Sequence, residues 1–222
     1  MAARRRLVRI DGPEAFARVF PVSRETISHL ELYEDLLQRW QKAVNLVSVG
    51  SLSDVWHRHF ADSAQLARLV PSRATSIVDL GSGGGFPGLV LAIVLADRAP
   101  VRVKLVESDK RKAAFLSEMA RQTGVAVDIL ATRVESPETQ AKIQAVDVVT
   151  ARALAPLNRL LHLAAPFFAA ATVGLFLKGR GVQREIEEAR AGWRFDVELV
   201  PSLTEADGHV AVVRELIAKT EG

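Results

Sequence analysis

From residue 76 onward, short runs of β-branched and apolar residues alternate with helix-like segments, and this alternation limits the fold more than any other feature of the sequence. Helical periodicity fills residues 87–95 and 111–123, between the runs. Strands that alternate with helices are typical of βαβ units, so the sequence predicts an α/β protein with a parallel, doubly wound sheet. The expected strands are SIVDL, VRVKLVES, VAVDIL, VDVVTA and TVGLFLK, which begin at residues 76, 101, 125, 146 and 172.

The first seventy residues have a different, helical pattern. Between residues 23 and 45, apolar side chains recur every three or four positions, which predicts an amphipathic helix with Ser23 as its N-cap. A second helical stretch is expected over residues 53–69, and Pro71 prevents it from continuing. We therefore expect an N-terminal helical cap, residues 1–70, packed on the core.

The end of the chain completes that core. A charged helix is expected over residues 182–191, followed by two strands near residues 195–200 and 209–213. A turn-rich loop joins these strands, so we expect them to pair as an antiparallel edge of the sheet. Of the 222 residues, 49% are hydrophobic, which is enough to bury one sizeable core, and residues 71–222 are predicted to form one compact unit.

Composition narrows the class of protein. The net charge of +3 permits a nucleic-acid partner without requiring one. The chain has no cysteine, which excludes disulfides, thiolate metal sites and a cysteine nucleophile, and which suits a reducing cytoplasm. The longest apolar stretch, residues 89–96, is too short to cross a bilayer, so no membrane association is expected. The four arginines within residues 4–9 are interpreted as a solvated tail or as a contact to an RNA backbone.

The first expected strand runs into a glycine-rich loop, VDLGSGGGFPG, at residues 78–88. In an open α/β sheet the ligand lies beyond the carboxyl ends of the strands, and the first βα turn comes closest to it. Gly81, Gly83 and Gly85 allow the backbone to approach such a ligand, and Asp79 precedes them. Loops of this kind occur in P-loop proteins, in dinucleotide-binding folds and in methyltransferases that use S-adenosylmethionine.

The spacing separates these three classes. A P-loop ends in Gly-Lys-Ser/Thr, whereas here Gly88 is followed by Leu89. A dinucleotide fold needs a third glycine where Phe86 stands, so a dinucleotide-dependent oxidoreductase is only an alternative. The remaining pattern, Asp-x-Gly-x-Gly-x-Gly, resembles the first motif of Rossmann-like methyltransferases. Glu107, with Ser108 beside it, ends the next strand, where such folds place an acid on ribose hydroxyls.

The chain also resembles one family, RsmG, which is also called glucose-inhibited division protein B. The resemblance covers about residues 40–180, and its motifs follow one another in the same order as in the family. It implies a Rossmann-like class I methyltransferase fold, with a seven-stranded, mostly parallel sheet and helices on both faces. It also implies transfer of a methyl group from S-adenosylmethionine to guanine N7 in 16S ribosomal RNA, with guanine-527 as the family target. The stretches that carry it are NLVSV, WHRHFADS, VDLGSGGGFPG, ATRVES and TARALAPL.

The resemblance assigns site residues one by one. Arg152, after the fourth strand, is expected to position the cofactor and the substrate. The sequence departs from the family at two places, since Glu107 stands where an aspartate is common and Phe86 replaces an aliphatic residue. The cofactor residues it implies are Asp79, Gly81, Gly83, Gly85, Phe86, Glu107, Ser108, Val134, Glu135 and Arg152. The residues expected to contact RNA are Arg58, His59, Lys178 and Arg180.

The chemistry of the target agrees with this assignment. Methylation of pyrimidine carbon 5 generally needs a cysteine nucleophile, which the chain lacks. Exocyclic amines are typically methylated beside an (Asn/Asp/Ser)-Pro-Pro-aromatic corner, whereas residues 150–153 read Thr-Ala-Arg-Ala. Guanine N7 has an in-plane lone pair and no proton, so an in-line displacement needs alignment but no general base. Arg152 cannot stabilise a cationic purine, so its role must be positional.

Two further interpretations concern the histidines and the partners. His57 and His59 lie two positions apart, do not share a helix face, and are not expected to bind metal. Arg58, His59 and Asp62 are instead expected to form a polar seam between the helical region and the sheet. The modest charge favours an assembled or partly assembled small ribosomal subunit as the substrate. A small-molecule methyltransferase and a non-enzymatic RNA-binding module are the alternatives.

Overall fold

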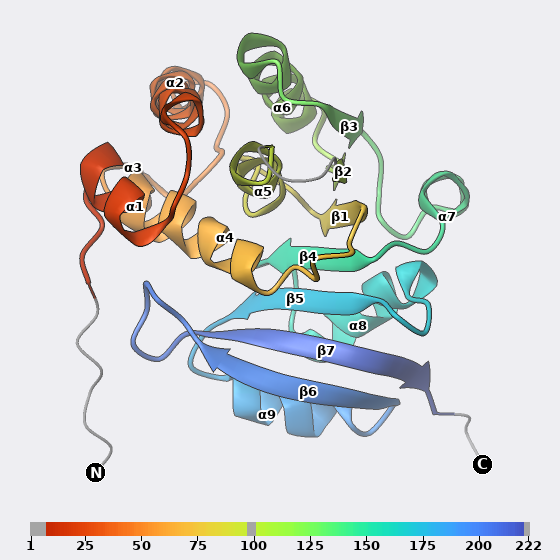
Figure 1. Cartoon of the computed structure of the whole chain (residues 1–222). Helices are drawn as coiled ribbons and strands as arrows, with labels where there is room; N and C mark the ends of the chain where they lie inside the picture. Colours follow the sequence, from red (N-terminus) through yellow and green to blue (C-terminus); the bar gives the residue numbers. More distant parts are fainter. Residues whose placement is uncertain (1–7, 97–100, 220–222) are drawn as a thin grey trace.

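The computed structural model describes residues 8–96 and 101–219, so Arg4, Arg5 and Arg6 lie outside the described residues. Its centre is a seven-stranded sheet in the order β3-β2-β1-β4-β5-β7-β6 (Figure 1). The strands are β1 (Ser76–Leu80), β2 (Arg102–Val106), β3 (Val127–Leu130), β4 (Val148–Arg152), β5 (Val173–Lys178), β6 (Trp193–Pro201) and β7 (His209–Ala218).

The connections make this sheet mostly parallel. Strands β1 to β5 pair in parallel, whereas β7 lies between β5 and β6 and is antiparallel to both. The predicted parallel sheet and its antiparallel edge are therefore confirmed. The order of the strands reverses at β1, because β2 lies on one side of it and β4 on the other. Ligands of open α/β sheets bind in the crevice at such a switch point.

Apolar residues on both faces hold the central strands in the interior. Ile77 and Val148 pack into the cluster on one face, and Val78 and Val149 pack into the cluster on the other. All four are fully buried. Parallel strands covered on both faces need such continuous apolar runs, and this is why SIVDL and VDVVTA were readable as strands.

Helices cover both faces of the sheet (Figure 1). The first face carries the N-terminal helices together with α5 and α6, and the second carries α7, α8 and α9. Among the described residues, no helix is both long and apolar enough to span a bilayer. The longer helices are α1 (Pro13–Val19), α2 (Arg24–Gln41), α5 (Gly88–Val94), α6 (Lys110–Thr123), α7 (Pro137–Ile143), α8 (Leu157–Ala164) and α9 (Val182–Ala189). The shorter ones are α3 (Val49–Leu52), η1 (Trp56–Ala61), α4 (Asp62–Ala64), η2 (Gln65–Arg68) and η3 (Ala165–Phe167).

The N-terminal helices show one confirmation and one difference. Ser23 caps α2 as predicted, because its Oγ accepts a hydrogen bond from the Thr26 N–H at 3.1 Å. The single helix expected over residues 53–69 instead changes its hydrogen-bond pattern twice, through the π-helix η1, the short α4 and the 3₁₀ helix η2. π-helical turns are rare in proteins, and those that do occur are often found at functional sites. The division into a cap and a core stays a prediction.

Candidate functional site

Two cavities open at the carboxyl ends of the central strands. The smaller, of about 210 Å³, is lined by Gly81, Ser108, Val134 and Glu135 among others. These four residues come from three different loops, and the family resemblance implies that all of them bind the cofactor. The structure therefore brings together the residues expected around the methyl donor's methionyl part, ribose and adenine.

The larger cavity is a cleft of about 730 Å³. Arg58, His59, Arg152 and Lys178 line it. Its walls come from the N-terminal helices, from the ends of β4 and β5, and from the loop between β6 and β7. The two cavities share Leu154 and Ala155, which follow β4, so they adjoin at this loop.

The glycine loop is shaped by close packing. Gly81 and Gly85 have φ values of +67° and +94°, which side chains rarely adopt. A Cβ on Gly81 would lie 2.6 Å from Leu154 Cδ1, and a Cβ on Gly85 would clash with the Tyr33 hydroxyl. Glycine is therefore required at both positions by conformation, and at Gly85 also by the space that the buried Tyr33 hydroxyl occupies.

Glu107 connects the end of β2 to this loop. Its Oε2 accepts a hydrogen bond from the Gly83 N–H at 2.8 Å, and its Oε1 accepts from the Asp109 N–H at 2.7 Å. Glu107 is only 7% exposed. Both oxygens keep a second lone pair, so the group can still accept hydrogen bonds from a ligand beside the loop.

Asp79 lies fully buried beneath the loop. Its Oδ1 accepts a hydrogen bond from Thr150 Oγ1 at 2.8 Å, whereas its Oδ2 has no hydrogen-bond partner among the described residues. Burial raises the pKa of this carboxyl to about 6, and the Thr150 and Ser82 hydroxyls and the Gly88 N–H oppose that shift. A fully buried carboxyl with a raised pKa is typical of a functional position.

Phe86, on the far side of the loop, is the centre of an aromatic stack. Tyr33 lies parallel to it at 5.3 Å between ring centroids, with 7° between the planes. His59 stacks on Phe86 at 4.8 Å, and the guanidinium carbon of Arg152 lies 4.9 Å from the centre of the same ring. Phe86 is buried and lines neither cavity, so it contacts the walls of the cleft rather than its interior.

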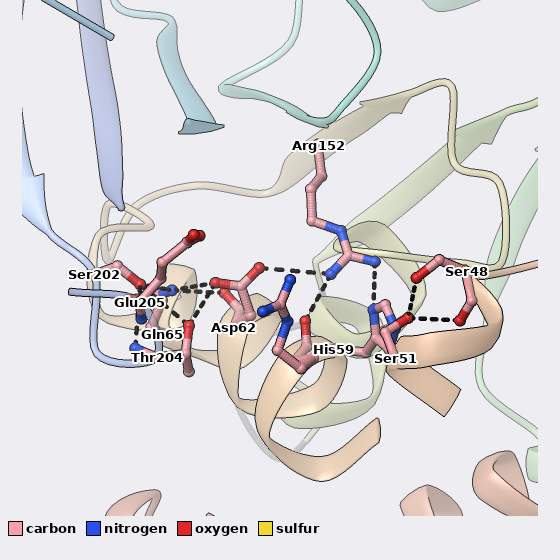
Figure 2. A network of polar contacts seen from close by, with 10 residues as sticks. Ser48, Ser51, His59, Asp62, Gln65, Arg152, Ser202, Thr204 and Glu205 are labelled. Atoms are coloured by element: carbon pink, nitrogen blue, oxygen red, sulfur yellow. Dashed lines mark hydrogen bonds and ion pairs between the residues drawn. The ribbon is translucent and has the colours of Figure 1, made fainter. Parts of the chain in front are cut away.

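Arg152 reaches from the end of β4 to the π-helix η1, as Figure 2 shows. One terminal nitrogen donates to the Arg58 carbonyl oxygen at 3.0 Å and lies 3.5 Å from Asp62 Oδ2. The other donates to His59 Nδ1 at 2.8 Å. A guanidinium can only donate, so His59 carries its proton on Nε2 and donates it to Ser51 Oγ at 2.8 Å. The predicted seam of Arg58, His59 and Asp62 is thus built around Arg152.

The same network continues to the loop between β6 and β7 (Figure 2). Asp62 Oδ1 accepts hydrogen bonds from Thr204 Oγ1 at 2.8 Å and from Gln65 Nε2 at 2.9 Å. Gln65 Oε1 in turn accepts from the Leu203 N–H at 2.8 Å. Three walls of the cleft are therefore joined by one set of polar contacts.

The two remaining residues that were expected to contact RNA, Lys178 and Arg180, lie outside the polar network of Arg152. Lys178 lines the cleft, but its side chain is only 8% exposed and its ammonium pairs with Glu185 at 2.6 Å. Arg180 is 87% exposed, pairs with Asp207 at 3.0 Å and does not line the cleft. In the described parts of the chain, no three His, Cys, Asp or Glu side chains are placed to hold a metal ion.

Sequence reasoning did not identify Tyr33, Gln65 and Thr204 as parts of this site. Tyr33 is the only tyrosine of the chain and occupies an apolar position of α2, where its hydroxyl needs a partner when buried. This need for a hydrogen-bond partner is a signal in the sequence that Tyr33 contacts a polar group of another segment. Gln65 and Thr204 gave none, because their contacts join segments about 140 residues apart in the sequence.

The strand order and the paired cavities at the switch point define a Rossmann-like class I methyltransferase fold. A solved O-methyltransferase from Bacillus cereus in complex with SAH has the same fold, with a TM-score of 0.59 and 16% identity, over 91% of this chain and 96% of that one.

A family model described as GidB, rRNA small subunit methyltransferase G, matches residues 26–211. Ribosomal RNA small subunit methyltransferase G of Parvibaculum lavamentivorans is 52% identical over 91% of this chain and 89% of its own length. The protein of the same name from Rhodospirillum rubrum is 48% identical over 92% and 98%. The chain belongs to the rRNA small subunit methyltransferase G family, which confirms the resemblance.

His59 tests the polar network directly. Burial, together with the charges of Arg152 and Arg58, lowers the pKa of His59 to about 3. Because this value lies below the usual 6.5, the imidazole stays neutral when the pH falls from 7 to 5. We expect nitrogen-15 NMR, assigned with a His59→Gln variant, to show a neutral ring protonated on Nε2 throughout that range. A His59 resonance that titrates near pH 6.5 would contradict the network.

Proposed function

We propose that this chain transfers a methyl group from S-adenosylmethionine to N7 of a guanine in 16S ribosomal RNA, with guanine-527 as the target. The observation that carries the proposal is the meeting of the two cavities at Leu154 and Ala155, beside the glycine loop. Membership of a family of small-subunit rRNA methyltransferases supports the methyl donor and the class of RNA. The guanine, its N7 and the mechanism are the finer part of the proposal.

The residues around the smaller cavity fit the cofactor. The Gly81 backbone and the buried Val134 supply a close, apolar wall, and Ser108 and Glu135 supply a hydroxyl and a carboxylate for ribose and adenine. Asp79 lines neither cavity and lies buried beneath the loop, where its carboxylate would attract the cofactor's ammonium group. When bound, the cofactor supplies an electrophilic methyl group attached to a positively charged sulfur.

The larger cleft is assigned to the RNA. In this proposal the polar side chains of the cleft position the RNA and do not transfer protons. Both nitrogens of His59 are engaged by Arg152 and Ser51, and the low pKa of His59 makes its imidazole a poor base. Guanine N7 carries no proton, so a site without a base suffices for in-line displacement. In the same proposal Arg152 positions the cofactor loop and the cleft wall, and Arg58 and Arg180 contact RNA phosphates.

The partner follows from the substrate. A net charge of +3 supports weak binding to naked RNA, which favours the small ribosomal subunit or an assembly intermediate as the substrate. Because the proposed substrate is a ribosomal particle, we expect the activity in the cytoplasm. Residues 1–70 act in this proposal as a cap, since η1 and α3 supply one wall of the cleft.

Methyl transfer to ribosomal particles tests the function. Small subunits from cells that lack this protein are incubated with labelled S-adenosylmethionine, and the RNA is cleaved chemically at N7-methylguanine. We expect one cleavage site, which disappears with the Gly81→Asp variant because a side chain at Gly81 clashes with Leu154. Cleavage at another guanine would show that guanine-527 is not the methylated nucleotide. Label transferred to a metabolite pool but not to RNA would favour a small-molecule methyltransferase.

The pH dependence of the chemical step tests the absence of a base. The two groups beside the glycine loop with pKa values near 6 and 3, Asp79 and His59, are both largely deprotonated above pH 7. Under single-turnover conditions, we therefore expect the rate constant to change less than about twofold between pH 7 and 9. A tenfold rise per pH unit would show that a proton is removed in the transition state.

A further inference from the structure

We infer that Tyr33 is a positioning residue for the cofactor, acting through the carbonyl of Gly84 from a helix outside the Rossmann-like core. Tyr33 lies on α2, which precedes the glycine loop by about fifty residues and packs on the same face of the sheet as α5 (Figure 1). The inference rests on the proposed function only in that the glycine loop binds S-adenosylmethionine.

The contact is a buried, neutral hydrogen bond. The Tyr33 hydroxyl donates to the Gly84 carbonyl oxygen, and the Tyr33 side chain is fully buried. Burial raises the pKa of Tyr33 well above its usual value, so the hydroxyl keeps its proton at every physiological pH. The space next to the hydroxyl is filled by Gly85, where a Cβ would clash with it. The hydroxyl is therefore fitted to this turn of the loop.

The ring adds a second restraint to the first. It lies parallel to Phe86, at 5.3 Å, and packs against Phe60 and Phe115, at 5.3 and 6.0 Å between centroids. The hydroxyl thus holds one residue of the loop while the ring holds a residue two positions later. Between them, these contacts define the backbone of Gly84, Gly85 and Phe86 from outside the loop.

The loop depends on such an outside restraint. Glycines have many accessible backbone conformations, and Gly81, Gly83 and Gly85 all have positive φ values here. Glu107 holds the Gly83 N–H, and Tyr33 holds the Gly84 carbonyl, so the two contacts fix the peptide group before Gly83 and the peptide group after Gly84. When only a fraction of the molecules has the binding-competent loop, the apparent Kd rises by the inverse of that fraction. Loss of the Tyr33 hydroxyl should therefore weaken cofactor binding.

The test compares two variants of one helix. Tyr33→Phe keeps the ring and its stacking but leaves the Gly84 carbonyl without its donor. Leu37→Val, one turn later on α2 and fully buried in the same core cluster, shortens a side chain beside Tyr33 on the helix and keeps the Tyr33 hydroxyl. Calorimetric titration with S-adenosylhomocysteine measures the Kd of each protein without RNA. We expect Tyr33→Phe to raise the Kd about tenfold and Leu37→Val to leave it within about twofold.

Two further readouts separate this role from a purely structural one. In the RNA assay, Tyr33→Phe should raise the KM for S-adenosylmethionine and leave the KM for the ribosomal particle unchanged. Its melting temperature should fall no further than that of Leu37→Val. A wild-type Kd for Tyr33→Phe, or an equal rise with Leu37→Val, would overturn the inference. If the wild-type chain itself binds no S-adenosylhomocysteine, the proposed function fails, and the inference fails with it.

Discussion

A guanidinium that has lost most of its water needs acceptors inside the protein, and the site depends on where Arg152 finds them. They come from η1, which supplies the Arg58 carbonyl and the His59 ring, and from the first residue of α4, which supplies the Asp62 carboxylate. The flat face of the same guanidinium lies over Phe86 of the glycine loop. One side chain at the end of β4 therefore joins the sheet, the helical layer and the cofactor loop, and the cleft is open at that junction.

This arrangement suits a reaction that needs alignment. The polar groups nearest to the glycine loop are committed to one another, and the tautomer of His59 is determined by the donor beside it. Asp62 connects this group to Thr204, so the loop between β6 and β7 is held against the π-helix. A rigid cleft next to a rigid cofactor loop lowers the entropic cost of bringing two reactants together. The proposed base-free methyl transfer needs an arrangement of this kind.

Much of the fold was readable because its signals are local. Buried parallel strands are continuous apolar runs, and a strand that ends in Asp79 and three spaced glycines marks the first βα turn. Gly81 and Val134 come together because parallel strands end at one edge of the sheet. The change from an α-helix to the π-helix in residues 56–61 and the contacts of Tyr33 and Thr204 were not readable. They depend on packing between distant segments, which leaves no periodic pattern in the sequence.

We propose that the smaller cavity holds the cofactor and that the larger cleft receives the RNA. A crystal structure of the chain with S-adenosylhomocysteine distinguishes the two cavities. We expect density for the adenosyl group beside Val134 and Glu135, with the contacts of Arg152 to His59 and Asp62 retained. Density for the ligand inside the larger cleft, among Arg58, His59 and Lys178, would contradict it.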